Sequence, residues 1–233
     1  MLRAALKSLL GRKVRLLMST FAIVLSVAFV GGSLIFSDTL GRSFTALFAS
    51  TVGDVVVRPA DSQEGIGAST VSMPADVVTT LEEEVPDAAR VDGRVRAVGV
   101  YVVDKDNKVV GGQGPPAFGG SYSDAPAGHG LTGLALVQGR APDGPDEVVL
   151  DAKTAERSGY FLGEKVHIVT AGDQAVVTPI LVGLMGFPEG GTLNGATYAG
   201  FDTARAQDLF LDGQDAFTQV WVTAKGGVSQ EQL

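Results

Sequence analysis

The chain has 233 residues, 45% of them hydrophobic and 19% charged, with a formal net charge of −8. Residues 1–37 hold five basic side chains and no acidic one, whereas the remaining residues hold 13 basic and 26 acidic side chains. This acidic bulk argues against a nucleic-acid partner, and the absence of cysteine excludes disulfides, cysteine-ligated metals and a lipoprotein anchor.

The stretch Leu16–Phe36 predicts a transmembrane helix. It contains 21 residues without a charge, and a helix of that length rises about 30 Å, the thickness of a bilayer's hydrocarbon core. Residues 37–50 continue an apolar helical stripe and predict a stalk, which acts as a rigid lever unless the helix breaks at Gly41. Residues 1–15 predict a basic interfacial helix on membrane lipid. The positive-inside rule places the N-terminus in the cytoplasm and the residues after about 37 outside the cell membrane.

The residues after the stalk alternate between strand and helix patterns. Helices are predicted at 73–87, 151–159 and 202–211, and the second of these ends near Gly159. Strands are predicted at 52–58, 89–104, 147–150, 165–170, 176–184 and 217–223, and the second of these turns at Asp106-Asn107 into a hairpin. Residues 60–72, 111–133 and 187–195 are predicted loops, rich in glycine.

The end of the sequence predicts a helix start. Ser229 and Gln232 have the spacing of a capping box, so we expect the sequence to be a fragment of a longer chain.

No catalytic or metal motif is present in the sequence. The patterns G-x-S-x-G, H-E-x-x-H and G-x-x-x-x-G-K-[ST] do not occur, and His129 and His167 lack metal-ligand spacing. We therefore expect no enzymatic activity, no cofactor and no metal. The aromatic residues Phe118, Tyr122 and Phe187 lie in the predicted glycine-rich loops and are candidates for contact with a substrate or partner.

The sequence resembles the permease subunits of MacB/FtsX/LolC-type ABC transporters, particularly actinobacterial ones. The resemblance is carried by LKSLLGRKVRLLMSTFAIVLSVAFV, SDTL, GDVVVRP, MPADVVTTLEEEVPDAARVDG and QGRAPDGPDEVVLDAKTAERSGYFLGEKVHIVT. Within the last segment, residues 159–166 are similar to the family phrase G-L-x-x-G-D-x-V. These motifs are signatures of the fold and name no substrate.

The resemblance implies an α+β protein: an N-terminal transmembrane helix with a stalk, then a porter-like α/β extracytoplasmic domain with an inserted β-rich lobe. It divides the outer part into a porter-like subdomain at 51–133, the lobe at 134–195 and a return to the α/β subdomain at 196–233. It also implies a separate ATPase subunit that binds ATP, a second permease copy or half in a dimer, and further membrane helices. Family members couple ATP hydrolysis to movement of the outer domain, and export or extract lipoproteins, peptides or other amphiphiles.

Two other hypotheses remain open at this stage. One is a single-pass anchored extracytoplasmic domain that binds or regulates, for example by activating a cell-wall hydrolase. The other is a secreted domain whose N-terminal segment is removed beyond Ser33. The sequence downstream of Leu233 distinguishes them, because a permease continues into three or more further membrane segments.

Overall fold

The computed structural model describes residues 13–49, 53–60, 71–111, 115–128, 132–171, 174–188, 192–229 and 232–233, with only the backbone described at 14, 16 and 36–49. The chain forms two compact units, Met1–Leu47 and Phe48–Leu233. The interfacial helix is predicted at residues 1–15, of which 1–12 lie outside the described residues and 13–15 belong to the first described helix. His129 also lies outside the described residues.

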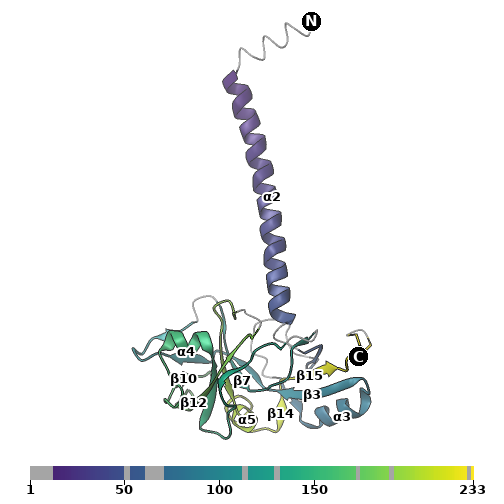
Figure 1. Ribbon diagram of the computed structural model, residues 1–233, viewed down its shortest axis with the longest axis vertical. Helices are drawn as coiled ribbons and strands as arrows, with labels where there is room; N and C mark the ends of the chain where they lie inside the picture. Colours follow the sequence, from purple (N-terminus) through teal and green to yellow (C-terminus); the bar gives the residue numbers. More distant parts are fainter. Residues whose placement is uncertain are drawn as a thin grey trace. The chain divides into compact units, whose positions relative to one another are not determined.

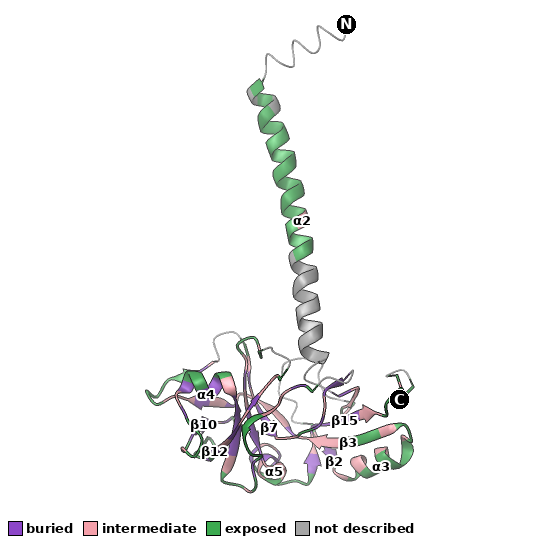
Figure 2. Ribbon diagram, in the orientation of Figure 1, coloured by how far each residue is buried: buried purple, intermediate pink, exposed green. Residues whose placement is uncertain are grey.

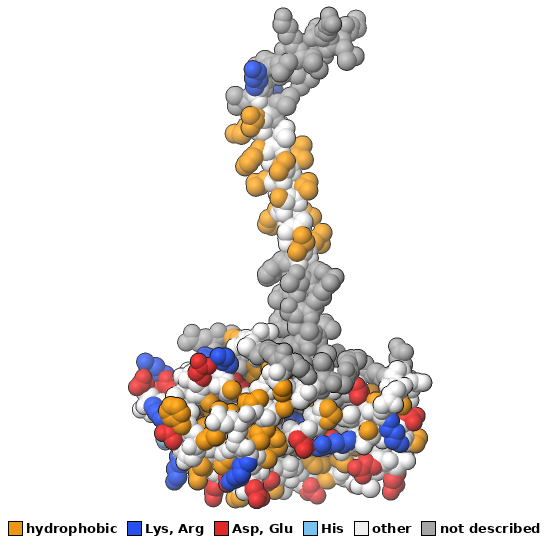
Figure 3. Space-filling model, in the orientation of Figure 1, with side chains coloured by type: hydrophobic (Ala, Val, Ile, Leu, Met, Phe, Trp, Pro, Cys, Tyr) orange, Lys and Arg blue, Asp and Glu red, His pale blue; other side chains and the backbone are white. Residues whose placement is uncertain are grey.

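One continuous helix, α2 (Lys13–Ala49), contains both the predicted membrane segment and the predicted stalk. It passes through Gly41 without a break. Among the described residues, Leu17–Ile35 is the one span long and apolar enough to cross a membrane, with a mean hydropathy of 2.0. The hydroxyl groups of Ser19 and Ser26 donate to the carbonyl four residues earlier, which satisfies them without water. Figures 2 and 3 show exposed and largely hydrophobic side chains around this span.

The second unit is rich in short strands. Its strands are β1 (Val55–Val57), β2 (Met73–Pro74), β3 (Ala88–Arg94), β4 (Arg96–Val98), β5 (Tyr101–Val103), β6 (Val109–Val110), β7 (Ala117–Ser121), β8 (Ala135–Gly139), β9 (Glu147–Asp151), β10 (His167–Val169), β11 (Val176–Val177), β12 (Ile180–Gly186), β13 (Thr197–Phe201), β14 (Ala216–Phe217) and β15 (Gln219–Ala224). Its helices are α3 (Asp76–Glu84), α4 (Ala152–Ser158) and α5 (Thr203–Phe210).

A first hydrophobic core lies between α3 and one face of a three-stranded antiparallel sheet of order β1-β15-β3. The apolar stripe of α3, including Val77, Val78 and Leu81, packs against the valines of this face. The predicted helix therefore forms, but it begins at Asp76 and not earlier. The reason is that Pro74 belongs to β2, where it pairs with Ala216 of β14.

A second, larger core is built from a six-stranded sheet of order β4-β7-β13-β9-β12-β8 and a four-stranded sheet of order β11-β10-β5-β6, together with α4 and α5. Phe201, Leu150 and Ile168 are among its fully buried side chains. Asp151 accepts the Thr154 N–H at 2.9 Å and caps α4. The helix ends at Gly159, as predicted, and this glycine adopts the left-handed conformation. Figure 1 shows β3, β15 and α3 at one end of the unit and α4, β10 and β12 at the other, with β7 between them.

The predicted strand at 89–104 is wrong in one respect, because the segment forms three strands in three different sheets. β3 and β4 are separated by Val95 alone, and β4 is separated from β5 by a turn in which Gly99 has a φ of 83°. Val95 is buried in the second core, whereas Val91 belongs to the first. The alternation of valines is therefore real, but the chain crosses from one core to the other in the middle of it. The predicted hairpin itself forms between β5 and β6, with Asn107 in the left-handed region of its turn.

The predicted loop at 111–133 contains β7, an interior strand of the six-stranded sheet. A Cβ at Gly120 would lie 2.0 Å from the carbonyl oxygen of Val95, and one at Gly119 would lie 2.7 Å from the side chain of Val100. Glycine is therefore required at these two positions because the Val95 backbone and the Val100 side chain lie too close to admit a Cβ atom.

The six-stranded sheet crosses both boundaries that the sequence analysis set within the outer part. It joins β4 and β7 to β8, β9, β12 and β13, so neither 133/134 nor 195/196 separates two sheets. The second core extends from Val95 to Phe217, which is wider than the lobe expected at 134–195. The first core consists of residues before and after this span.

Candidate functional site

The face of the three-stranded sheet that points away from α3 carries charged and polar side chains. Along β3, Arg90, Asp92 and Arg94 alternate with core residues, and Asp92 pairs directly with Trp221 of β15. Side chains at alternate positions of a strand share one face. Trp221 is 7% exposed, so this face is covered at Trp221, whereas Arg90 on the same face is exposed.

The guanidinium of Arg94 lies over the ring of Trp221, with its central carbon 4.2 Å from the ring centroid. Its Nη2 donates to the carbonyl oxygen of Ser121 over 3.5 Å, a long hydrogen bond. Its Nε and the Nε1 of Trp221 are buried and have no hydrogen-bond partner among the described residues. The stacking therefore holds the guanidinium in place while leaving donors unused.

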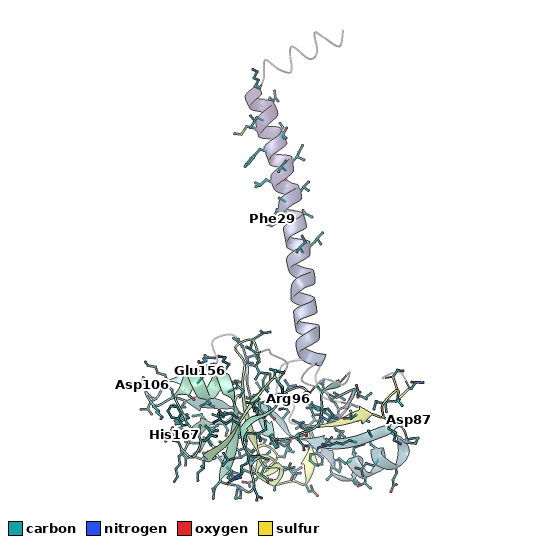
Figure 4. The ribbon with its side chains drawn as sticks, viewed as in Figure 1. Phe29, Asp87, Arg96, Asp106, Glu156 and His167 are labelled. Carbon is teal, nitrogen blue, oxygen red and sulfur yellow. The ribbon has the colours of Figure 1, made fainter. Side chains whose placement is uncertain are left out.

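Arg96 lies at the edge of the six-stranded sheet, opposite Gly120 on β7. Its guanidinium carbon is 4.3 Å from the centroid of Phe118, and no described residue accepts a hydrogen bond from its side chain. Burial lowers the pKa of Arg96, and the charges of Arg58 and Arg94 lower it further, against the opposing effect of Tyr198. In Figure 4, Arg96 lies between Asp87 on one side and Glu156, Asp106 and His167 on the other. We call Arg94 and Arg96, together with the exposed Arg58 whose charge acts on Arg96, the arginine cluster.

Two buried hydroxyl groups fix the backbone that carries the arginine cluster. The Thr218 hydroxyl donates to the carbonyl of Arg94 at 3.2 Å and accepts the N–H of Arg96 at 2.8 Å. The Ser121 hydroxyl accepts the N–H of Val95 at 3.0 Å, and the Ser121 N–H donates to the Val95 carbonyl at 2.9 Å. The two arginines are thus held by the segment at which the chain passes between the cores.

Two acids near Arg94, Asp92 and Asp124, form ion pairs with another arginine, while Asp92 Oδ2 has no hydrogen-bond partner among the described residues. Arg90 contacts Asp92 at 2.6 Å and Asp124 at 2.7 Å. The hydrogen bond from Arg90 lowers the pKa of Asp124. Burial raises the pKa of Tyr122, Asp124 raises it further, and Arg94 opposes both effects. Tyr122 therefore lies within electrostatic reach of Arg94.

The structure places the three predicted contact residues in different settings. Phe118 is on β7 beneath Arg96 and is half-buried, so it does not lie on a loop. Tyr122 follows the same strand, and its N–H donates to the Phe201 carbonyl at 2.7 Å. Phe187 directly follows β12 and is half-buried. By the strand register, β12 ends at the same end of the strands at which β7 and β13 begin. Phe187, which follows β12, and Phe118, near the start of β7, therefore belong to the same end of the six-stranded sheet.

The sequence analysis did not identify the arginine cluster. The sequence alternates as Arg90-x-Asp92-x-Arg94-x-Arg96. The valines of this segment were used to predict a strand, but the charged residues between them, which share its other face, were not used to predict a site. Elsewhere in the described residues no group of three or more His, Cys, Asp or Glu side chains could hold a metal ion.

Comparison with known proteins decides the family. The family model for the MacB-like periplasmic core domain matches residues 16–233. This chain belongs to that family. No functionally curated protein sequence matches the chain.

Three solved structures are similar to this MacB-like chain. The periplasmic region of MacB from Actinobacillus actinomycetemcomitans is 16% identical, with a TM-score of 0.43 over 68% of each chain. A domain of a permease protein from Porphyromonas gingivalis is 15% identical, with a TM-score of 0.44 over 70% of this chain and 73% of its own. The extracellular domain of the noncanonic ABC-type transporter YknZ from Gram-positive bacteria is 14% identical, with a TM-score of 0.42 over 67% and 75%.

Proposed function

We propose that this chain provides the first membrane helix and the extracytoplasmic core domain of an ABC transporter permease subunit. A separate ATPase subunit binds and hydrolyses ATP in the cytoplasm, and a second permease copy completes a dimer within membrane lipid. The chain itself has no enzymatic activity and binds no cofactor. Movement of the outer domain exports or extracts a lipoprotein, a peptide or another amphiphile.

The observation that carries the proposal is the continuity of α2. Its 37 residues extend about 55 Å at 1.5 Å per residue, which exceeds the hydrocarbon thickness of a bilayer by roughly 25 Å. Five residues then lead from Ala49 to β1, an edge strand of the first core. In the proposed mechanism, a displacement of α2 reaches along the chain to the sheet that carries Trp221 and Arg94, because only five residues separate α2 from β1 in the sequence.

The orientation can be tested with single cysteines, because these 233 residues contain none and any cysteine in the rest of the full-length permease is first replaced by serine. In cells that express the full-length permease, a membrane-impermeant maleimide should label D106C, which lies in the exposed turn between β5 and β6. It should label S8C only after the membrane is permeabilised. The opposite labelling pattern would reject a cytoplasmic N-terminus.

The lever can be tested at Gly41. In the permease–ATPase complex, spin labels on D106C of the two permease copies should report an ATP-dependent change in distance. Gly41→Pro disfavours the helix by about 2 kcal/mol relative to glycine, whereas Gly41→Ala favours it by about 1 kcal/mol. We expect the proline variant to lose the change and the alanine variant to keep it. An unchanged response in Gly41→Pro would exclude α2 as a rigid coupling element.

The contact residues form a separate test. Alanine at Phe118, Tyr122 and Phe187 together should reduce export, with the complex and its ATPase activity still present. Normal export by this triple variant would show that these three residues do not contact the substrate. It would leave the proposed coupling role of α2 untouched. If the native gene continues only into soluble sequence, the permease proposal is wrong and the hypothesis of a single-pass anchored regulatory domain takes its place.

A further inference from the structure

We propose that the arginine cluster binds an oxyanion group, a phosphate or carboxylate, of a small ligand or a lipid headgroup. The inference concerns the outer domain alone and does not depend on ATP-driven movement.

The cluster differs from the other arginines whose contacts are described. Arg90, Arg140 and Arg205 each form an ion pair with a carboxylate. The described residues provide no carboxylate contact to Arg94 or Arg96, although the charge of Asp124, which is paired with Arg90, also acts on Arg94. The exposed Arg58 adds a positive charge near Arg96. Charged groups that are withdrawn from water without a partner are unfavourable, and like charges placed together increase the cost. An oxyanion supplies the missing counter-charge.

The stacking geometry prepares both guanidinium groups for an oxyanion. The aromatic rings of Trp221 and Phe118 occupy a face of Arg94 and Arg96, respectively. A guanidinium has five N–H donors in its plane, arranged to bind carboxylate or phosphate oxygens in pairs. Contact with a ring uses the face and leaves the edge donors available, except for Arg94 Nη2, which donates to the Ser121 carbonyl over 3.5 Å. The orientation is therefore fixed before a ligand binds, which reduces the entropy lost on binding.

Two unsatisfied buried donors point to the same conclusion independently of the charges. Arg94 Nε and Trp221 Nε1 are buried without an acceptor among the described residues, and Trp221 is 7% exposed. Buried donors are normally satisfied in folded proteins, so each unsatisfied one requires an explanation. Both donors lie on the polar sheet face that also carries Asp92, whose Oδ2 is buried without a partner among the described residues, so a ligand that accepts from the two donors must keep its oxygens away from this carboxylate.

The negative net charge of residues 38–233 means that an anion can be bound only by direct contact at a local site, and not by general electrostatic attraction. Residues 38–233 contain twice as many acidic as basic side chains, so the outer domain repels anions at long range. Binding of an anion therefore depends on direct contact with the cluster, and removing a single arginine should be sufficient to lose it.

Trp221 allows a direct test, because it is the only tryptophan among the 233 residues and lies beneath Arg94. The 233-residue chain in an uncharged detergent is titrated with inorganic phosphate, with chloride at equal ionic strength as the reference. We expect a saturable change in Trp221 fluorescence with phosphate alone. Arg94→Gln and Arg96→Gln should each raise the dissociation constant at least tenfold. The matched control Arg140→Gln removes an exposed arginine outside the cluster and should leave binding unchanged.

A second arm separates the two sources of the oxyanion. The same proteins are placed in nanodiscs of phosphatidylcholine with and without phosphatidylglycerol, and the Trp221 signal is measured before and after phosphate addition. A change caused by phosphatidylglycerol, which then blocks the phosphate response, identifies a lipid headgroup; an unaltered phosphate response identifies a soluble ligand. Both outcomes support the oxyanion site.

The proposal is overturned by either of two results: no saturable response to phosphate or to phosphatidylglycerol, or an equal response in Arg94→Gln, Arg96→Gln and wild type. If a glutamine variant does not fold, Arg94→Lys and Arg96→Lys replace it. These variants keep the charge but lose the paired donors, so they should weaken phosphate binding as well. Lysine variants that bind as tightly as wild type contradict the paired-donor geometry.

Discussion

Gly120→Ala should destabilise the outer domain more than most surface or loop substitutions. The added Cβ would lie 2.0 Å from the carbonyl oxygen of Val95, and this atom is backbone, so it cannot rotate away. Overpacking in a filled interior costs about 1–3 kcal/mol. Separation of the two chains also weakens the two hydrogen bonds between Val95 and Ser121, each worth about 1 kcal/mol. We therefore expect a loss of about 3–5 kcal/mol in the free energy of unfolding.

Thermal unfolding of the 233-residue chain in an uncharged detergent, followed by circular dichroism, measures this loss. For a unit of this size, about 3–5 kcal/mol corresponds to a decrease in melting temperature of roughly 6–20 °C. Gly226→Ala is the matched control, since a Cβ there meets nothing within 4 Å and should change stability by less than about 0.5 kcal/mol. Equal stability of the two variants would refute the close contact between β4 and β7, and with it the placement of β7 inside the sheet.

Three further predictions concern separate features of the outer domain. Phe201→Ala should destabilise the protein by about 3–5 kcal/mol because the side chain is fully buried, whereas Phe161→Ala, at a position 72% exposed, should change the free energy of unfolding by less than about 0.5 kcal/mol in the same assay; equal effects would contradict the assigned core. The hydrogen bond from Arg140 lowers the pKa of Glu147 to about 2, so its contribution to stability is fully present above the ordinary glutamate pKa and is lost as the pH falls towards 2; in an NMR titration Arg140→Gln should move the Glu147 pKa back towards its ordinary value, and an unmoved pKa would exclude the pair as the cause. Asp151→Ala removes the acceptor of both the Thr154 and the Tyr198 N–H groups and should cost about 2–4 kcal/mol in denaturant unfolding, while a loss below 1 kcal/mol would show that water replaces the carboxylate.

The features that the sequence predicted are those specified by neighbouring residues. The hairpin between β5 and β6 follows from two short valine runs around Asp106-Asn107. Helix α4 follows from a capping Asp151 and a terminal Gly159. The membrane helix follows from composition alone. In each case the determining interactions lie within one turn or one helix, so local pattern is sufficient.

The features that the sequence did not predict depend on residues distant in the chain. The segment at 117–121 contains two glycines and no β-branched residue, and its strand pairing comes from β4 and β13 on either side. The arginine cluster likewise requires β3 to pair with β15, which brings Arg94 to a tryptophan more than a hundred positions away. Periodicity within a segment carries no information on which segments pair, so neither feature could be found from local pattern.

The two points at which the chain crosses between the cores lie side by side, since the Thr218 N–H donates to the Arg94 carbonyl at 3.0 Å and Arg94 pairs with Gln219. Replacing residues 95–218 by Asn-Gly would therefore convert β3 and β15 into an ordinary β-hairpin, although it would also remove β14, the pairing partner of β2. The larger core is thus joined to the first by two adjacent chain crossings, at residues 94–95 and 218–219, and by the pairing of β2 with β14. Its sequence, size and loops can vary widely between related proteins while the unit joined to the membrane helix keeps the same fold.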